Sequence, residues 1–360
     1  MKAIVFAGGV GTRLWPLSRR SSPKQFEKVI GDKSTLQLAA ERLLPDLNWE
    51  DIYIATSDRY EHIVISQLPN IPKENLILEP ETRDVGPAVG LMTLSLLRNF
   101  PEEPIVILWS DHIVRQEDFF KKIIKTCAEI VRKQKNKIIF IGQKPRFASQ
   151  NLGWIKYGEK KHSFEGVDFY SFEKFHYRPE LKKAERFYKD GSYSWNVGYF
   201  VTTPSFLWGL FKKFQPEMFK ILEKVYKAYG TKSFQAVLKE NYGLLSKISF
   251  DNAILENISS SDALVVCENL GWSDIGAWEA LKEALQSSPE QNVIQGKVLV
   301  TDCHDSLIYN YTNQMVVTID LNGYLVINTN DVVLICHKNS VPKIKKLVES
   351  LAKSENEHLI

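Results

Sequence analysis

Short apolar runs alternate with longer helical patterns up to about residue 145. Five runs are apolar on both faces, as in parallel strands that are buried on both sides. They are KAIVFA from residue 2, DIYIAT at 51–56, NLILE at 75–79, PIVILW at 104–109 and KIIFIG at 137–142. Between them, residues 34–44, 58–68, 85–99 and 116–134 carry apolar residues at helical spacing, with Ser34 and Ser57 as expected N-caps. This alternation predicts an α/β fold with a doubly wound, mostly parallel, Rossmann-like sheet.

The middle of the chain has a different texture. From 150 to 203 the apolar runs are aromatic and punctuated by glycine, as in GWIKYG, VDFYSFEKF and YSWNVGYFVT, with one charged helical pattern at 179–190. We interpret these runs as an inserted antiparallel layer that covers the ligand-binding edge of the sheet. Residues 204–257 are mostly helical in pattern, and LVVCENL at 264–270 predicts a further strand.

After Pro289 the pattern changes to short β runs that are separated by Asn, Asp and Gly turns. The last pattern is an amphipathic helix, VPKIKKLVESLAK, which we expect to dock on these strands rather than on a membrane. We therefore expect two domains, a nucleotidyltransferase-type catalytic domain over 1–287 and a small C-terminal β domain with a terminal helix over 288–360. The even spacing of the strands leaves a short β-helix open.

The charge balance is close to neutral, with 46 basic and 43 acidic residues and a formal net charge of +3. This balance argues against a nucleic-acid-binding protein, and no apolar run approaches the roughly 20 residues that span a bilayer. Four cysteines lie far apart without metal or redox spacing, which indicates reduced thiols in a cytoplasmic protein. The first apolar run breaks at Gly8 and Gly9 and meets Arg13, so we expect no signal peptide.

A glycine-rich segment follows the first strand. In GGVGTRLWPLSRRSSPKQF, the glycines Gly8, Gly9 and Gly11 are followed by Arg13 and Lys24. Glycines let backbone N–H groups close around phosphate oxygens, and a triphosphate with about four negative charges needs fixed cations beside them. A tight turn with surface cations explains the same residues equally well. The segment lacks the P-loop order, and a proline stands near the point where the dinucleotide fingerprint starts its helix.

Several ordered motifs carry a family resemblance. GGVGTRLWPLS resembles the signature of nucleoside-diphosphate-sugar pyrophosphorylases, and PKQF is similar to their mannose-1-phosphate guanylyltransferase branch. LEPETRDVGPA, WSDH, FEK, SWNVGYF, SFDNAILE and GWSDIGAWEAL have counterparts there in the same order, over about residues 1–290, and the terminal β segment resembles the appendage of that branch. The resemblance implies transfer of GMP from GTP to α-D-mannose 1-phosphate. It also places the nucleotide on Gly8, Gly9, Gly11, Thr12 and Arg13.

Two carboxylates are expected to hold a metal. Asp111 ends the apolar run PIVILWSD, where an acid is costly unless it has a partner, so a metal ligand and a helix cap are both open. The resemblance implies Mg²⁺, or another divalent cation such as Mn²⁺, bound by Asp111, Asp274 and nucleotide phosphates. His112 is adjacent, but Mg²⁺ prefers oxygen ligands, which favours a structural histidine. Arg13, Lys24 and Asp111 are the expected catalytic residues.

The resemblance places guanine on LEPETRDVGPA, with Glu79, Arg83 and Gly86 as the expected contacts. A carboxylate can accept the N1 and N2 hydrogens of guanine, which adenine cannot supply, so Glu79 is the candidate for base selection. An ordinary surface ion pair between Glu79 and Arg83 is equally open. The family commonly has Asn-Thr-Ala after this arginine, whereas Asp84, Val85 and Gly86 follow it here.

For the hexose phosphate, the resemblance implies sugar contacts from Gly153, Glu173, Asn196 and Asp251 and a phosphate contact from Lys174. Short polar groups of this kind suit hydroxyl recognition, although each alone is also typical of a turn or a cap. The chain departs from the family where Phe175 replaces the proline after the Glu-Lys pair. Arg178 is therefore a second candidate for the phosphate contact.

The implied reaction is a single in-line displacement on the α-phosphorus of GTP, with pyrophosphate as the leaving group. Three other classes stay open: another sugar-1-phosphate nucleotidylyltransferase such as a glucose-1-phosphate thymidylyltransferase, a non-catalytic subunit of the same fold, and a dinucleotide-dependent oxidoreductase. Some relatives carry a fused isomerase domain, and because the chain stops soon after the β appendage we expect one activity. The appendage is also a candidate contact for a homodimer.

Overall fold

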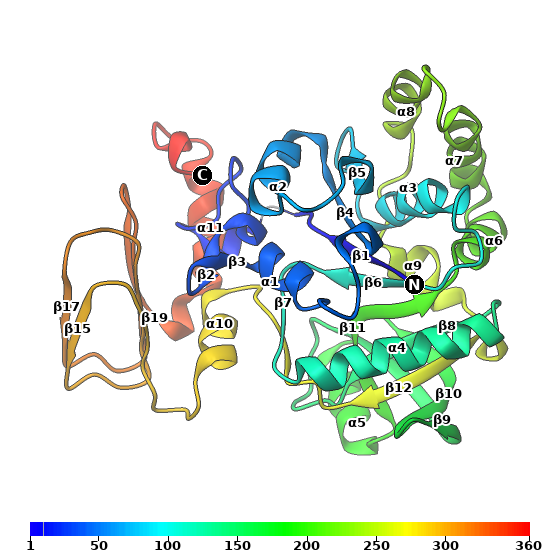
Figure 1. The fold of residues 1–360 in the computed structure, drawn as a ribbon. Helices are drawn as coiled ribbons and strands as arrows, with labels where there is room; N and C mark the ends of the chain where they lie inside the picture. The colour runs from blue at the N-terminus through cyan, green and yellow to red at the C-terminus, as the bar shows by residue number, and fades with distance from the viewer. Residues whose placement is uncertain (10) are drawn as a thin grey trace. The chain divides into compact units, whose positions relative to one another are not determined.

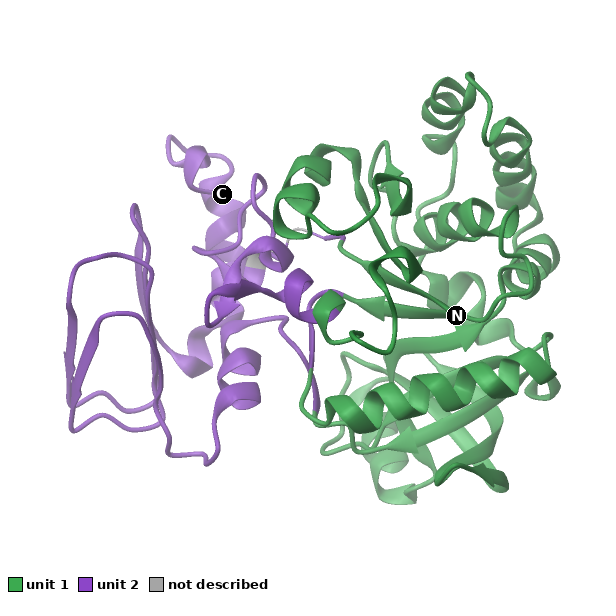
Figure 2. Ribbon diagram, in the orientation of Figure 1, with its two compact units in different colours: residues 1–7, 40–109, 114–271 green, residues 8–39, 110–113, 272–360 purple. Residues whose placement is uncertain are grey.

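A computed structural model describes residues 1–9 and 11–360, with only the backbone of Thr12. These residues form two compact units, which Figure 2 distinguishes by colour. Unit 1 consists of Met1–Ala7, Ala40–Trp109 and Val114–Gly271, and unit 2 consists of Gly8–Ala39, Ser110–Ile113 and Trp272–Ile360. Each unit is therefore assembled from segments that are distant in the sequence.

Unit 1 is built on a nine-stranded sheet with the order β5-β4-β1-β6-β11-β8-β12-β10-β9 (Figure 1). The strands are β1 (Lys2–Phe6), β4 (Ile52–Ser57), β5 (Leu76–Glu79), β6 (Ile105–Trp109), β8 (Ile138–Gln143), β9 (Gly153–Phe164), β10 (Val167–His176), β11 (Tyr193–Thr202) and β12 (Ala263–Glu268). β1 pairs in parallel with β4 and β6, β4 with β5, and β8 with β12. The predicted fold class is confirmed, because all five runs that are apolar on both faces form strands with a parallel neighbour.

The aromatic strands belong to this same sheet rather than to a separate layer. β11 runs antiparallel between β6 and β8, while β9 and β10 form an antiparallel pair. Their aromatic side chains, including Phe172, Phe175 and Phe200, face the core that also holds Ile4 and Ile107. These strands are antiparallel, as predicted, and burial of their aromatic rings makes them part of the central sheet.

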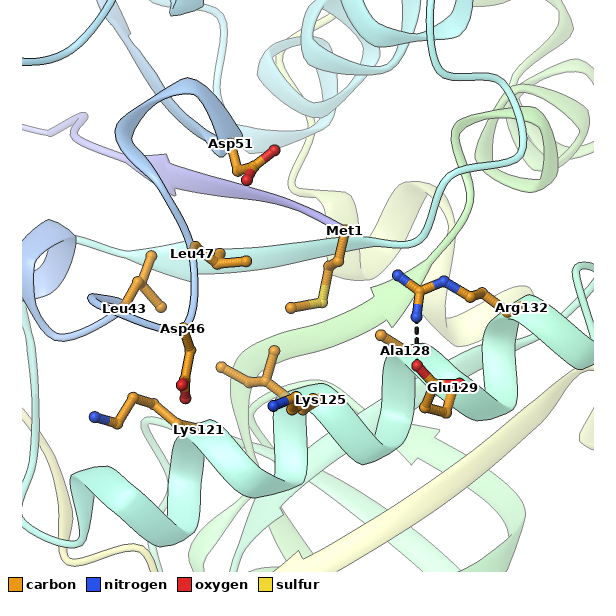
Figure 3. Close-up of a pocket in the computed structure, with 11 residues that line it drawn as sticks. Met1, Leu43, Asp46, Leu47, Asp51, Lys121, Lys125, Ala128, Glu129 and Arg132 are labelled. Carbon is orange, nitrogen blue, oxygen red and sulfur yellow. Dashed lines mark hydrogen bonds and ion pairs between the residues drawn. The ribbon is translucent and has the colours of Figure 1, made fainter.

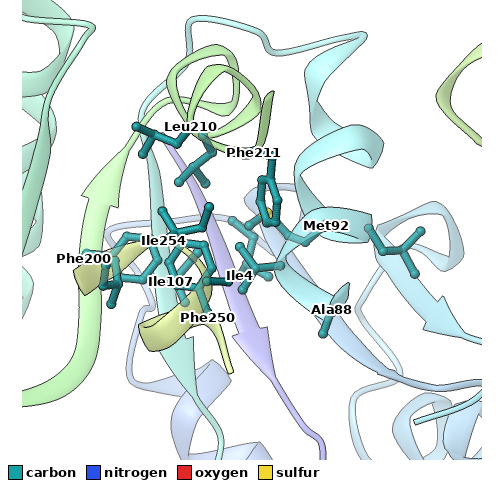
Figure 4. Close-up of a cluster of buried hydrophobic side chains, with 14 of the residues drawn as sticks. Ile4, Ala88, Met92, Ile107, Phe200, Leu210, Phe211, Phe250 and Ile254 are labelled. Atoms are coloured by element: carbon teal, nitrogen blue, oxygen red, sulfur yellow. The ribbon is translucent and has the colours of Figure 1, made fainter. Parts of the chain in front are cut away.

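Helices cover both faces of the sheet in unit 1. They are α2 (Glu61–Gln67), α3 (Val85–Leu97), α4 (Glu117–Lys133), α5 (Leu181–Asp190), α6 (Pro204–Phe214), α7 (Pro216–Ala228), α8 (Phe234–Tyr242) and α9 (Phe250–Ala253). In the core of Figure 4, Met92 of α3 and Leu210 of α6 lie in one cluster with Ile4 of β1. Alternate strand residues point to the other face. There Phe120 of α4 packs on Tyr199 of β11 with ring centroids 5.2 Å apart, so direct aromatic contact fixes α4 on the sheet.

One of the two expected caps is present. The amide of Gln37 donates to the Ser34 hydroxyl at 3.2 Å, and the amide of Ser34 donates to the Gln37 side chain at 2.9 Å. This reciprocal pair starts α1 (Thr35–Glu41), as expected for an N-cap. The prediction for Ser57 is wrong, because Ser57 precedes a short 3₁₀ helix and its hydroxyl donates to the Asp58 carboxylate at 3.4 Å instead of accepting from a backbone amide.

Unit 2 contains both the glycine-rich segment and the C-terminal strands. Its strands are β2 (Lys28–Ile30), β3 (Lys33–Ser34), β7 (His112–Val114, whose last residue belongs to unit 1), β13 (Trp272–Asp274), β14 (Val293–Gln295), β15 (Val298–Thr301), β16 (Leu307–Asn310), β17 (Val316–Ile319), β18 (Tyr324–Asn328) and β19 (Val333–His337). Its helices include the 3₁₀ helices η1 (Thr12–Leu14), η2 (Lys24–Phe26) and η9 (Glu357–Leu359), with α10 (Trp278–Leu285) and α11 (Pro342–Leu351).

The C-terminal strands stack as successive turns of a coil. β14, β16 and β18 pair in parallel, β15 pairs in parallel with β17, and β19 closes the first set as an antiparallel strand. Leu307 and Leu325 of these strands share one core with Ile344 and Val348 of α11. The terminal helix therefore docks on the β segment, as its apolar stripe predicted. Among the residues that the structure describes, no helix has both the length and the apolar character of a membrane span.

Candidate active site

The glycine-rich segment of unit 2 has a backbone that suits glycine. Gly9 and Gly11 have φ values of +89° and +66°, a region that other residues rarely adopt. A Cβ atom on Gly11 would lie 2.6 Å from Cγ and Cδ of Lys24, so the Lys24 stem packs directly on this glycine. Within the described residues, the N–H groups of Gly8, Gly9 and Gly11 donate no hydrogen bond, which leaves them available to an anion. The side chain of Thr12 lies outside what the structure describes.

Lys24 and Asp111 form an ion pair in unit 2. The Lys24 Nζ atom lies 2.6 Å from Oδ2 of Asp111 and donates to the Ile275 carbonyl at 3.0 Å. Burial of the Asp111 carboxyl raises its pKa, but the charge of Lys24, the charge of His112 and the hydrogen bond from Lys24 outweigh burial and hold the pKa at about 2. Asp111 is therefore ionised at neutral pH.

His112 lies beside this pair. Its Nε2 atom is 3.8 Å from Oδ1 of Asp111, an ion-pair distance when the imidazole is protonated. The imidazole ring meets the Trp272 ring edge to face, with centroids 5.1 Å apart. Packing on an aromatic ring agrees with the structural role that we expect for this histidine.

Asp274 and Arg13 also belong to unit 2, and the side chains of both lie close to Gly276. β7 and β13 form a two-stranded sheet, and the Ile275 amide donates to the Asp111 carbonyl at 2.9 Å. A Cβ atom on Gly276 would lie 3.2 Å from both an Arg13 guanidinium nitrogen and Oδ2 of Asp274. Unit 2 thus gathers two cationic side chains, Arg13 and Lys24, and two carboxylates, Asp111 and Asp274.

Two carboxylates are a donor set that fits a hard divalent cation. Mg²⁺ is usually held by one or two carboxylates, with water and substrate phosphates as the other ligands. Among the described residues, no group of three or more His, Cys, Asp or Glu side chains is arranged to hold a metal. Asp111 and Asp274 therefore fit a cation that takes its remaining oxygens from a bound phosphate or from water.

In unit 1, Glu79 is held by a tyrosine from a distant helix. Glu79 ends β5, and its Oε2 atom accepts the hydroxyl of Tyr242 at 2.6 Å. Burial raises the pKa of Glu79 to about 7, although the hydrogen bond from Tyr242 lowers it in part. Arg83 pairs with Glu81 at 3.1 Å. The surface ion pair between Glu79 and Arg83 that the sequence left open is therefore wrong.

The start of α3 is tightly packed. Asp84 has a φ of +71° and accepts the Val85 amide at 2.7 Å as the N-cap of the helix. Gly86 is buried, its amide donates to the Ile248 carbonyl at 2.9 Å, and a Cβ atom there would lie 2.7 Å from that oxygen. Gly86 permits this close approach, and its contact with a nucleotide stays a prediction.

Three of the predicted sugar-site residues lie together. Gly153 and Asn196 are partners on the paired strands β9 and β11. The Asn196 side chain donates to Asp251 at 3.1 Å and accepts the Gly198 amide at 3.0 Å. Burial raises the pKa of Asp251 to about 6 against the lowering effects of a backbone hydrogen bond and the charge of Arg178. This cluster offers a buried carboxyl and an oriented amide, which suit sugar hydroxyls.

Glu173 and Lys174 are placed differently. The pairing of β10 with β9 has a register shift between Phe172 and Lys174, so that Phe172 and Phe175 both enter the core. Glu173 and Lys174 are exposed, and Glu173 pairs with Lys156 at 3.0 Å. Within the described residues, no hydrogen bond or ion pair joins either side chain to Gly153, Asn196 or Asp251. Their sugar-site roles stay predictions.

A separate cavity lies at the amino-terminal ends of β1 and β4 (Figure 3). Its volume is about 230 Å³, and its lining includes Met1, Asp51 and residues of α4 such as Lys125 and Arg132. None of the predicted site residues lines it. Because ligands of doubly wound sheets bind at the carboxyl ends of the strands, we do not assign this cavity to the active site.

Sequence motifs did not identify two residues of these clusters. Tyr242 lies in ENYGLLS, which carries no motif, and only the packing of α8 beside β5 reveals its contact with Glu79. Gly276 lies within GWSDIGAWEAL, and its position between Arg13 and Asp274 is a matter of tertiary structure. The signal for Gly276 was available in part, since a glycine two residues after an expected metal ligand permits close approach.

Comparison with known proteins gives the class of this chain. The family described as Nucleotidyl transferase matches residues 2–291, and the MannoseP isomerase/GMP-like beta-helix domain matches residues 296–351. The chain therefore belongs to the nucleotidyl transferase family and is an enzyme. The second match agrees with the coil of parallel strands in unit 2.

The relatives narrow the comparison. The Mannose-1-phosphate guanylyltransferase of Salmonella muenchen is 33% identical over 361 residues, which cover 99% of this chain and 74% of that protein. The protein of the same name from Escherichia coli K12 is 32% identical over 363 residues, covering 99% and 75%. A crystal structure from Thermus thermophilus, described as a mannose-1-phosphate geranyltransferase, has 29% identity and a TM-score of 0.85 and covers 97% of this chain and 98% of its own.

Proposed function

We propose that this chain transfers GMP from GTP to α-D-mannose 1-phosphate, giving GDP-mannose and pyrophosphate. A phosphate oxygen of the sugar phosphate attacks the α-phosphorus of GTP, and the bond from that phosphorus to the bridging oxygen of the β-phosphate breaks. Both the attacking and the leaving groups are anions, so no protein nucleophile and no net proton transfer are needed. The work of the protein is positioning and charge neutralisation.

The observation that carries this proposal is the gathering of Arg13, Lys24, Asp111 and Asp274 in unit 2. Arg13 and Lys24 supply the cations that a triphosphate and a departing pyrophosphate require. The amides of Gly8, Gly9 and Gly11, which donate no hydrogen bond within the described residues, supply donors. Asp111 and Asp274 would hold Mg²⁺ or Mn²⁺ here, since two carboxylates suit a hard divalent cation that also binds substrate phosphates. Such a cation, when bound, supplies further neutralisation of phosphate charge.

Base and sugar recognition fall to unit 1 in this proposal. Glu79, held by Tyr242, would accept the N1 and N2 hydrogens of guanine as a carboxylate. Asn196 and Asp251 would bind mannose hydroxyls. For the sugar phosphate we favour Arg178 over Lys174, because the charge of Arg178 lowers the pKa of Asp251, whereas Lys174 is not among the charges that act on this carboxyl.

We also propose that the catalytic domain ends at residue 287 and that the C-terminal β domain begins at residue 288. The two compact units of the structure divide the chain differently.

We further propose a homodimer through the outer face of the coil. Leu299 and Val317 are register partners on β15 and β17, are 55% and 53% exposed, and lie beside Ile319, which is 63% exposed. Exposed apolar side chains that adjoin in this way are typical of an interface. Substitution of Val317 and Ile319 by Asp is expected to give a monomer in sedimentation experiments, whereas a wild-type monomer contradicts the dimer.

All four cysteines are free thiols, and together with the proposed nucleotide substrates this supports a cytoplasmic enzyme.

The test of the proposed function is release of pyrophosphate, measured by a coupled assay over a panel of nucleoside triphosphates and hexose 1-phosphates with Mg²⁺. GTP with mannose 1-phosphate is expected to give the highest kcat/KM. Preference for thymidine triphosphate with glucose 1-phosphate would overturn the substrate assignment, and no turnover with any pair would indicate a non-catalytic subunit.

A further inference from the structure

The turn that follows Arg13 is tied to the C-terminal part of unit 2. The indole N–H of Trp15 donates to the Leu359 carbonyl at 2.8 Å, and the Trp15 carbonyl accepts the indole N–H of Trp278 at 2.9 Å. Trp15 is buried and shares one hydrophobic core with α11. One residue therefore connects η1, the start of α10 and the segment around η9.

A second tie is an ion pair with bidentate geometry. Arg19 donates from Nη1 to Oδ2 of Asp331 at 2.8 Å and from Nη2 to Oδ1 at 2.6 Å. Its Nε atom donates to the Pro16 carbonyl at 3.1 Å, so the same guanidinium also holds the backbone of the turn. The hydrogen bond from Arg19 is the largest of the effects that lower the pKa of Asp331. Asp331 lies between β18 and β19, within the residues that match the beta-helix domain.

These ties reach Arg13 through the backbone. The Leu14 amide donates to the Gly11 carbonyl at 3.1 Å, and the Ser18 amide donates to the Leu14 carbonyl at 3.1 Å. The segment from Gly11 to Ser18 is therefore linked by consecutive hydrogen bonds, with Arg13 inside it. Arg13 is exposed, so little packing holds its side chain, and the backbone of this turn sets the point from which the side chain extends.

We propose that Arg19 and Asp331 are positioning residues, through which the C-terminal coil holds the turn that aims Arg13 at the polyphosphate. The effect of these two residues on catalysis rests on the proposed function, whereas the contacts that they make do not depend on it. It gives the beta-helix domain a part in catalysis in addition to any part in assembly. The contrasting explanation is an ordinary surface ion pair, since the Asp331 side chain is 46% exposed and such pairs contribute little to stability.

The two explanations predict different kinetics for Asp331→Asn. A surface ion pair predicts wild-type kcat. A positioning pair predicts a fall in kcat of about tenfold with the KM for mannose 1-phosphate changed less than about twofold, because misplacement of a catalytic group lowers the rate without weakening remote binding. Arg19→Lys is expected to behave like Asp331→Asn, since lysine cannot supply the bidentate contact. Glu223→Gln is the matched control, because it removes an exposed ion pair with Lys227 of α7 in unit 1, where N and O are 3.0 Å apart.

Hydrogen exchange supplies a readout that needs no substrate. In Asp331→Asn, the amides of Leu14, Leu17 and Ser18 are expected to exchange faster than in the wild type, whereas Glu223→Gln leaves them unchanged. Faster exchange together with reduced kcat supports the proposal. Unchanged exchange overturns it, and so does faster exchange with wild-type kcat. If the wild type does not turn over GTP and mannose 1-phosphate, the proposed function fails, and the kinetic arms are then measured with the best substrate pair of the panel.

Discussion

The two units differ in the hydrogen-bond and ion-pair partners of their polar site residues. In unit 2 the four site residues are charged, and Lys24 and Asp111 form an ion pair. In unit 1 the two buried carboxyls, Glu79 and Asp251, have raised pKa values and accept hydrogen bonds from the neutral side chains of Tyr242 and Asn196. The difference indicates two tasks. Paired charges suit the neutralisation of phosphates, and buried carboxyls with neutral partners suit the recognition of uncharged hydrogen-bond donors on a base or a sugar.

The largest expected effect is on the charged side of this comparison. Arg13→Ala is expected to lower kcat by about 10²–10³, the usual cost of losing one donor that stabilises developing charge, with a smaller change in KM. Steady-state kinetics with saturating Mg²⁺ measures it. Arg59→Ala, which removes an exposed cation that lies over the Tyr60 ring in unit 1, is the control and keeps wild-type kcat. Wild-type turnover in the Arg13 variant would remove the catalytic role from unit 2.

The sugar-phosphate contact comes next in size. Arg178→Ala is expected to raise the KM for mannose 1-phosphate about tenfold through loss of a charge-assisted contact, whereas Lys174→Ala leaves it within about twofold. The two variants remove the same charge from nearby positions, so each is the control for the other. The opposite order would assign the phosphate to Lys174, as the family motif implies.

A smaller effect is expected at the base. Tyr242→Phe removes the hydroxyl that donates to Glu79 and is expected to raise the KM for GTP about three- to tenfold, with kcat within about twofold. Tyr309→Phe is the matched control, because it removes a buried hydroxyl in unit 2 that donates to the Val29 carbonyl at 3.1 Å. Equal effects of the two variants on the KM for GTP would indicate a general loss of packing.

The pH dependence follows from the raised pKa of Glu79. Because burial raises this pKa to about 7, the carboxyl is mostly protonated below that pH and cannot accept both guanine hydrogens. We expect kcat/KM for GTP to rise severalfold between about pH 6 and about pH 8. The phosphates of the nucleotide titrate in part of the same range, and the slope that remains in Glu79→Gln measures their share. A wild-type slope equal to that of the variant would exclude Glu79 as the titrating group.

Much of the fold follows from local sequence pattern. The parallel strands were predictable because each is apolar on both faces, and α4 and α11 because each has one apolar stripe. Which segments of the chain make up unit 2 was not predictable. It depends on contacts between residues that are far apart in the sequence, such as Trp15 with Leu359, and periodicity carries no information about such contacts.

The candidate site was predictable where a motif fixes the backbone. Gly11, Lys24 and Asp111 lie together as expected, because strand ends and close glycine contacts dictate their positions. Prediction was less successful at FEKFHYR, since nothing local announces the register shift that brings both Phe172 and Phe175 into the core. Hydrophobic burial decides that register, and the charged residues between the two rings are consequently exposed.

One measurement tests most directly whether the two units have these different tasks. It is the ratio of kcat/KM for GTP to kcat/KM for ATP, with mannose 1-phosphate as the second substrate. The ratio is compared among the wild type, Arg13→Ala and Glu79→Gln. If unit 2 handles phosphates and unit 1 reads the base, Arg13→Ala lowers both values by a similar factor and keeps the ratio. Glu79→Gln is expected to lower the ratio about tenfold or more while kcat changes little. A changed ratio in Arg13→Ala, or an unchanged ratio in Glu79→Gln, would contradict this account.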